Sequence, residues 1–85
     1  MVLILDSWIA FKEYVEKYDN FVEISYRLDP IFAAPETRVR IAAGRYGLEL
    51  TLRKDDPTLQ EIREFLDTHD ARKIVESNET AAFFS

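Results

Sequence analysis

The apolar and polar positions of residues 37–53 alternate in a pattern that predicts a β-hairpin with a defined register. Every second residue is apolar on both sides of a central Gly44-Arg45 pair: Val39, Ile41, Ala43, Tyr46, Leu48, Leu50 and Leu52. A two-residue loop at Gly44-Arg45 puts all these side chains on one face of a sheet. The predicted cross-strand pairs are Ala43 with Tyr46, Ile41 with Leu48, and Val39 with Leu50. Gly44 stands first in the loop, where a type II′ turn needs a positive φ.

Residues 20–29 carry the same period of two and predict a strand before the hairpin. Its apolar positions are Val22, Ile24, Tyr26 and Leu28. The intervening residues are charged or polar, which is typical of a strand with one buried face. Pro30 ends the pattern because it has no N–H to donate. The connection that follows reads PIFAAPE, so Ile31 and Phe32 stand where polar turn residues are expected.

The first of two predicted helices has an apolar stripe with spacings of three and four residues. The stripe consists of Ile4, Trp8, Phe11, Val15 and Tyr18. Asp6 or Ser7 is a candidate N-cap, which would leave residues 2–5 free to form a short strand. If the whole stripe is helical, the helix begins near Val2 instead. The sequence leaves both alternatives open.

The second predicted helix starts at Asp55-Asp56-Pro57, with an Asp N-cap and a Pro at the first helical position. Its apolar stripe is Leu59, Ile62, Phe65 and Leu66. We expect the helix to end within residues 68–70. Residues 71–78 fit either a third helix or a strand. We expect residues 81–84 to be ordered, at a sheet edge or against a partner.

These elements predict a single α+β domain over residues 1–85. Its sheet is expected to be a three-stranded antiparallel meander, with terminal segments as optional extra strands. Two or three helices cover one face of this sheet, because their apolar stripes need an apolar surface. This order of elements is shared by many unrelated small domains and identifies no function.

Composition removes several classes of chemistry. The chain has 85 residues, no Cys and two Gly, which excludes disulfides, thiolate metal sites and a Gly-rich phosphate loop. No apolar run approaches the roughly 20 residues of a membrane span. The apolar start is too short for a signal peptide, so we expect a cytoplasmic protein.

Catalytic and metal-binding constellations are weak in this sequence. His69 is the only histidine and is flanked by Asp67 and Asp70, but on a helix residues two apart point in different directions. The acidic pairs lie on solvent faces or at a helix cap, where solvation and capping explain them. We therefore expect no enzyme, no cofactor, no metal and no small-molecule substrate.

The net charge of −5 is unevenly distributed. Residues 36–54 carry a net charge of +3 and residues 55–85 a net charge of −5. The hairpin cations are a candidate nucleic-acid surface: Arg38, Arg40, Arg45, Arg53 and Lys54. Against this stand the negative total charge, the predicted pairing of Glu49 with Arg40, and the lack of interleaved aromatics. The acidic C-terminal third offers another alternative, an acidic inhibitor or nucleic-acid mimic that binds a basic protein.

The surplus of aromatic residues favours a protein partner. Six aromatics fit the predicted inward face: Trp8, Phe11, Tyr18, Tyr26, Tyr46 and Phe65. Four do not fit it: Phe21, Phe32, Phe83 and Phe84. Apolar groups of this size are usually covered, by the fold's own loops or by another chain. Our leading hypothesis is a non-enzymatic protein-interaction module, expected to form a homodimer, that binds through these four residues.

Overall fold

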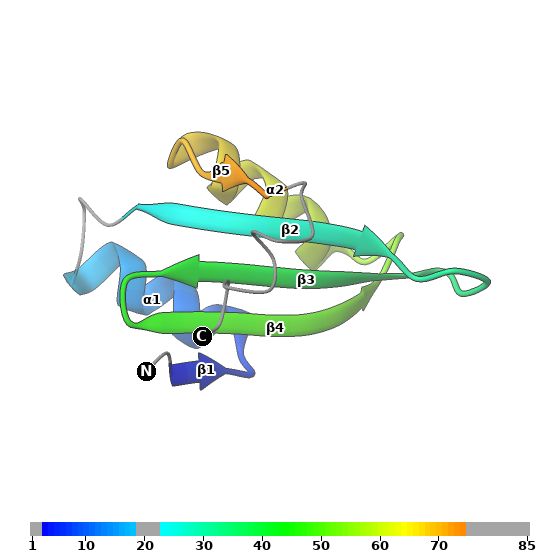
Figure 1. Cartoon of the computed structure of the whole chain (residues 1–85), viewed down its shortest axis with the longest axis horizontal. Coiled ribbons are helices and arrows are strands. Elements are labelled where there is room, and N and C mark those ends of the chain that lie inside the picture. The colour runs from blue at the N-terminus through cyan, green and yellow to red at the C-terminus, as the bar shows by residue number, and fades with distance from the viewer. Residues whose placement is uncertain (1–2, 19–22, 75–85) are drawn as a thin grey trace.

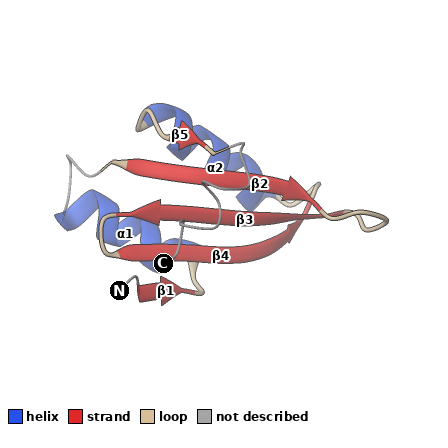
Figure 2. Cartoon of the chain, in the orientation of Figure 1, coloured by secondary structure: helices blue, strands red, loops and turns tan. Residues whose placement is uncertain are grey.

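The chain folds into a five-stranded mixed sheet with two helices on one face. The structure is a computed structural model that describes residues 3–18 and 23–74. Figure 1 shows the sheet face on, with both helices behind it, and Figure 2 separates helices from strands by colour. The elements are β1 (Leu3–Leu5), α1 (Trp8–Tyr18), β2 (Ile24–Pro30), β3 (Glu36–Ala43), β4 (Tyr46–Arg53), α2 (Pro57–Thr68) and β5 (Arg72–Lys73).

The strand order is β1-β4-β3-β2-β5, so the expected α+β class holds, and the terminal segments that the sequence left open extend the sheet to five strands. Strands β2, β3 and β4 form the antiparallel meander. Two short edge strands extend it, β1 parallel to β4 and β5 parallel to β2. Strands of three and two residues are too short to show a period of two. They also pair with partners distant in sequence, which a local pattern does not indicate.

The hairpin register is confirmed residue by residue. Ala43 lies opposite Tyr46, Ile41 opposite Leu48 and Val39 opposite Leu50. Gly44 has a φ of 60°, the positive value that the first loop position of a type II′ turn requires. The second strand is confirmed from Ile24 onward, and residues 20–22 of that prediction lie outside the described residues.

Both helices begin at residues that cap them. The backbone N–H of Ala10 donates to Ser7 Oγ at 3.3 Å, so α1 begins at Trp8 and leaves Leu3–Leu5 free to form β1. This decides between the two starts that the sequence left open. In α2, Thr58 N–H donates to Asp56 Oδ1 at 2.8 Å, and Pro57 is the first helical residue, as predicted.

The core lies between the helices and the apolar face of the meander. Its fully buried large side chains are Phe11, Val15, Val39, Ile41, Leu48 and Ile62. Each alternates along its strand or recurs at helical spacing, as the sequence pattern requires. Of the aromatics predicted to face inward, Tyr26 and Tyr46 are half-buried at the margin of this core, and the burial of Tyr18 is not described.

The two helices meet through an aromatic contact and an ion pair. Trp8 and Phe65 lie edge to face with ring centroids 5.0 Å apart. Beside them, Lys12 Nζ lies 3.0 Å from Glu61 Oε1. The hydrogen bond from Lys12 is the largest cause that lowers the pKa of Glu61, and the same bond raises the pKa of Lys12. The indole Nε1 of Trp8 also helps to lower the pKa of Glu61, but within the described residues it makes no hydrogen bond of normal geometry.

We predict that Trp8→Ala or Phe65→Ala lowers the free energy of unfolding by about 3–5 kcal/mol, because each removes a large buried ring from the contact between helices. Urea denaturation followed by circular dichroism measures this. A domain of this size has a total stability near the low end of roughly 5–15 kcal/mol, so either variant approaches global unfolding. Unchanged midpoints for both variants would contradict the assigned core.

We predict that Glu61→Gln destabilises the chain at neutral pH and has no effect in acid. The pKa of Glu61 is lowered from 4.5 by folding, so its contribution is present above pH 4.5 and disappears as the pH falls through the lowered value. The pKa of Lys12 is raised from 10.5, so its contribution is lost as the pH rises through that raised value. Thermal melts of the wild type and of Glu61→Gln from pH 3 to 9 measure the difference in melting temperature. A difference that persists in acid would mean that Glu61 acts through packing.

Candidate protein-binding tip

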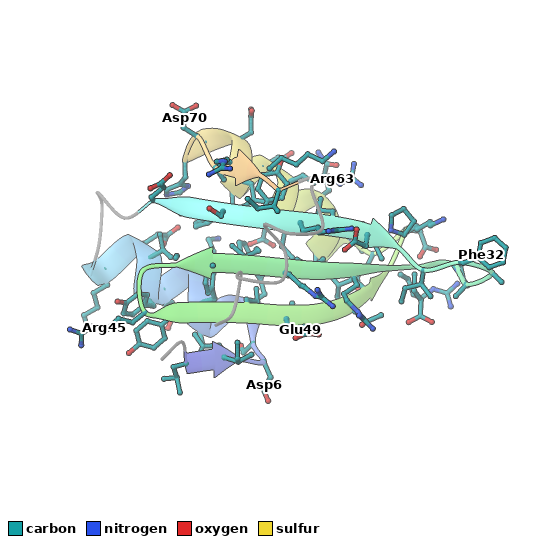
Figure 3. The ribbon with its side chains drawn as sticks, viewed as in Figure 1. Asp6, Phe32, Arg45, Glu49, Arg63 and Asp70 are labelled. Carbon is teal, nitrogen blue, oxygen red and sulfur yellow. The ribbon has the colours of Figure 1, made fainter. Side chains whose placement is uncertain are left out.

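The connection between β2 and β3 carries a fully exposed aromatic side chain. We call residues 31–35 the tip loop. Phe32 in this loop is 98% exposed, and Figure 3 shows it at the far end of the molecule, beyond the ends of the strands. Among the aromatic residues whose burial the structure describes, Phe32 is the only exposed one. The sequence identified it correctly as a residue outside the core.

Backbone hydrogen bonds hold the tip loop in one conformation. Ala34 N–H donates to Ile31 O at 3.2 Å and closes a four-residue turn with Phe32 in its second position. Ile31 N–H donates to Glu36 O at 3.0 Å, and Lys54 N–H donates to Pro35 O at 3.0 Å. The loop is therefore tied both to β3 and to the connection after β4, and these bonds set the direction of the Phe32 Cα–Cβ bond.

Ala33 occupies the third position of this turn with a φ of 63°. That left-handed conformation is usual for glycine and costs an L-residue with a Cβ roughly 1–2 kcal/mol. It is what lets a tight turn direct Phe32 outward, as in a type II turn. Backbone strain of this kind clusters at functional sites. Asp70, after α2, has the same conformation with a φ of 54°, so the exposure of Phe32 is what makes the tip loop the leading site.

The strand register divides the five predicted nucleic-acid-binding cations into three groups. Arg38, Arg53 and Lys54 lie at the same end of the sheet as the tip loop, since Glu36 pairs with Arg53 and Arg38 pairs with Thr51. Arg45 lies at the opposite end, in the β3–β4 turn (Figure 3). Strand β4 has eight residues, so roughly 25 Å separates Arg45 from Arg53 at the usual rise per residue.

The remaining cation, Arg40, lies mid-sheet on the face without helices. It is opposite Glu49, as predicted, with Nε 4.0 Å from Oε1. This is at the outer limit for an ion pair, and Arg40 Nε is buried without a hydrogen-bond partner in the described structure. Arg40 is therefore half-buried beside a neighbouring carboxylate.

The charges near the tip loop have both signs. Arg53 Nε lies 3.3 Å from Asp55 Oδ1, and Glu36 sits beside Arg53 in the register. Arg38 and Lys54 make no ion pair with any described residue. We call Glu36, Arg38, Arg53, Lys54 and Asp55 the tip rim. It has three cations and two anions, so the five predicted cations do not form one continuous basic surface.

Of the four predicted partner-binding residues, Phe32 lies within the described part of the chain. Phe21, Phe83 and Phe84 lie outside the described residues, as does the predicted order of residues 81–84. Three exposed apolar residues were missed by the sequence reasoning: Leu3, Ile4 and Ile9. Leu3 and Ile4 belong to edge strand β1, whose existence the sequence left open, and Ile9 falls outside the apolar stripe of α1.

His69 and two of the acidic residues, Asp56 and Glu61, have structural roles in the described part of the chain. His69 caps the C-terminus of α2, and its Nδ1 lies 2.8 Å from Phe65 O. Asp56 caps the N-terminus of the same helix, and Glu61 pairs with Lys12. Residues 3–18 and 23–74 contain no group of three or more His, Cys, Asp or Glu that could hold a metal.

Comparison of the chain with protein-family models, with curated proteins and with solved structures finds no match. Among the described helices, none is long and apolar enough to cross a membrane. The function therefore has to be argued from the site itself.

We predict that Phe32→Ala leaves the free energy of unfolding unchanged within about 0.5 kcal/mol, because a ring that stays in solvent contributes no burial. The matched control is Phe11→Ala, which removes a ring with no exposed surface and should cost about 3–5 kcal/mol. Urea titrations of the two variants make the comparison. Equal losses would mean that Phe32 packs against its own chain.

Proposed function

We propose that this chain is a non-enzymatic protein-interaction module that binds through the tip loop and self-associates. The observation that carries the proposal is the complete exposure of Phe32 on a loop with a fixed backbone. An exposed aromatic side chain contributes nothing to the stability of its own fold. Burying it in a partner is worth roughly 1.5–3 kcal/mol, and aromatic side chains are frequent anchors of protein interfaces.

The fixed conformation of the tip loop favours binding. Ordering a flexible loop at an interface opposes association through lost conformational entropy. Here the turn is already closed by the Ala34 and Ile31 hydrogen bonds, and Pro30 and Pro35 border it. The strained φ of Ala33 is present before any partner arrives. Most of the conformational entropy that ordering this loop costs is therefore lost when the chain folds, before Phe32 meets a partner.

The tip rim supports self-association in particular. In a two-fold symmetric dimer each surface patch meets itself. A patch with one sign of charge would repel its copy, but the tip rim pairs cations with anions across the register, as in Glu36 and Arg53. Arg38 and Lys54, which make no ion pair within the described part of the chain, can therefore face Asp55 or Glu36 of a second copy.

Nucleic-acid binding remains the alternative, and one observation favours it: an exposed Phe lies beside three cations. Proteins that bend DNA insert apolar wedges of this kind between base steps. The neighbouring Glu36 and Asp55, the distant Arg45 and the net charge of −5 weaken attraction to phosphate. An acidic mimic is supported less, because Asp55, Asp56 and Glu61 are each engaged within the chain.

Sedimentation equilibrium from about 1 μM to 1 mM, a range that spans weak to moderate dissociation constants, tests the proposal. We predict that the average mass of the wild type rises with concentration and that Phe32→Ala remains monomeric. The control is Ile9→Ala, which removes another exposed apolar side chain and should associate like the wild type. A wild type that stays monomeric, or an Ile9→Ala variant that alone dissociates, would contradict self-association through the tip loop.

The alternative is tested by retention of labelled single- and double-stranded DNA and RNA at about 50 mM salt, where phosphate-driven binding is strong. We expect no retention. The nucleic-acid proposal would replace the protein-interaction proposal if two results were obtained. Binding would have to weaken with added salt, and the double variant Arg53→Glu with Lys54→Glu would have to abolish it.

A further inference from the structure

The outer edge of β2 is only partly covered by β5. Strand β2 has seven residues, and β5 pairs with only two of them, Ser25 and Tyr26. Ile74 N–H donates to Tyr26 O at 2.8 Å, so the backbone groups of Tyr26 point to this edge. Because these groups alternate along a strand, the N–H and C=O of Leu28 point to the same edge. Among the described residues, none pairs with Leu28 there.

A groove of about 470 Å³ lies beside this edge, between β2, β5 and α2. Its volume falls within the usual range for ligand sites, roughly 300–1,000 Å³. Its apolar lining comes from Tyr26, Leu28, Leu66 and Ala71, and its charged lining from Arg63, Asp67, Asp70 and Lys73. Leu28 thus contributes an apolar side chain to the groove while its backbone groups face the uncovered edge.

The charges of the groove are distributed along β2. Figure 3 shows Arg63 beside the half of β2 that β5 leaves uncovered and Asp70 beyond the other end of β5. Lys73 is the last residue of β5 and lies opposite Tyr26. Neither Arg63 nor Lys73 makes an ion pair with a described residue. Arg63 and Lys73 therefore line the groove without an ion-pair partner among the described residues, Arg63 beside the far half of β2 and Lys73 opposite Tyr26, and Asp67 of α2 adds a carboxylate to the same lining.

We propose that this groove binds an extended, acidic segment of a partner protein. The segment adds to the edge of β2 as a strand, exchanges backbone hydrogen bonds with Leu28, and directs a carboxylate to Arg63 and Lys73. Strand addition supplies affinity through the main chain, and pockets for alternate side chains supply selectivity. Hydrogen bonds from arginine or lysine to a carboxylate are stronger than those between neutral groups. None of the tip-loop residues lines this groove, so binding at the groove is tested independently of self-association through the tip loop.

The first test is amide hydrogen exchange of the free protein, followed by NMR. We predict fast exchange at Leu28, because its N–H faces the outer edge of β2, where no described residue accepts a hydrogen bond from it. Arg27 and Asp29 lie opposite β3 residues and their N–H groups point toward that strand, so they should exchange slowly. Slow exchange at Leu28 in the free protein would overturn the proposal, because the edge would already be occupied.

The second test adds synthetic hexapeptides of alternating sequence. We predict that a Val-Glu peptide shifts and protects the Leu28 amide, whereas the matching Val-Lys peptide does not. A Val-Glu peptide that is N-methylated on the amides facing the protein should bind at least about tenfold more weakly, because the main-chain bonds are lost. Failure of the Val-Glu peptide to bind, or equal binding of its methylated form, would overturn strand addition.

The third test changes the cations. Arg63→Glu with Lys73→Glu should weaken binding of the Val-Glu peptide by about tenfold or more. The matched control is Lys17→Glu with Arg45→Glu, which makes the same change in charge at exposed residues that line neither the groove nor the tip rim and should alter affinity far less. Equal weakening by both pairs would assign the effect to total charge and overturn the proposed carboxylate contact.

Discussion

The two-residue turn at Gly44-Arg45 is the constraint on which the rest of the structure depends. It fixes which residues of β3 and β4 face each other, and one residue of slippage would turn every side chain to the opposite face. With Ala43 opposite Tyr46, the alternating apolar residues from Val39 to Leu52 face the helices. The same register continues into β2, where Tyr26 lies opposite Ile41 and Leu28 opposite Val39. The core, the polar face and the ends of the sheet all follow from this pairing.

Both proposed binding surfaces lie where the central meander ends or is incompletely covered. At one end, the β2–β3 connection continues past the core, and Phe32 has no surface of its own chain to bury against. At the outer edge, β5 is too short to pair with all of β2. A sheet of this size has unpaired edges that a protein must cover, shorten or use. In this domain short parallel strands cover part of each edge, β1 on β4 and β5 on β2. The groove beside α2 lies next to the part of β2 that β5 does not pair with.

Local patterns predicted the parts of the fold that depend on neighbours in sequence. The hairpin register, the Asp56 cap of α2 and the exclusion of Phe32 from the core all derive from spacings of a few residues. The edge strands remained open alternatives in the sequence, because Leu3–Leu5 and Arg72–Lys73 are too brief to show a period. Their partners are β4 and β2, tens of residues away. The groove was missed for the same reason, since it exists only where α2, β2 and β5 meet.

The distribution of the cations also required the three-dimensional register. In sequence, Arg38, Arg40, Arg45, Arg53 and Lys54 appear as one basic segment. In the sheet, Arg45 lies at the opposite end from Arg53, and Arg40 lies opposite Glu49. What lies together instead is an aromatic anchor and a rim of both signs. This arrangement, more than net charge, supports a protein partner.

The most direct test of this account is the aromatic NMR spectrum of the protein recorded over a dilution series. The account predicts that the ring resonances of Phe32 shift and broaden as the concentration rises, while those of the buried Phe11 stay constant. Association that shifts other resonances but leaves Phe32 unchanged, or a spectrum that is the same at every concentration, would contradict it.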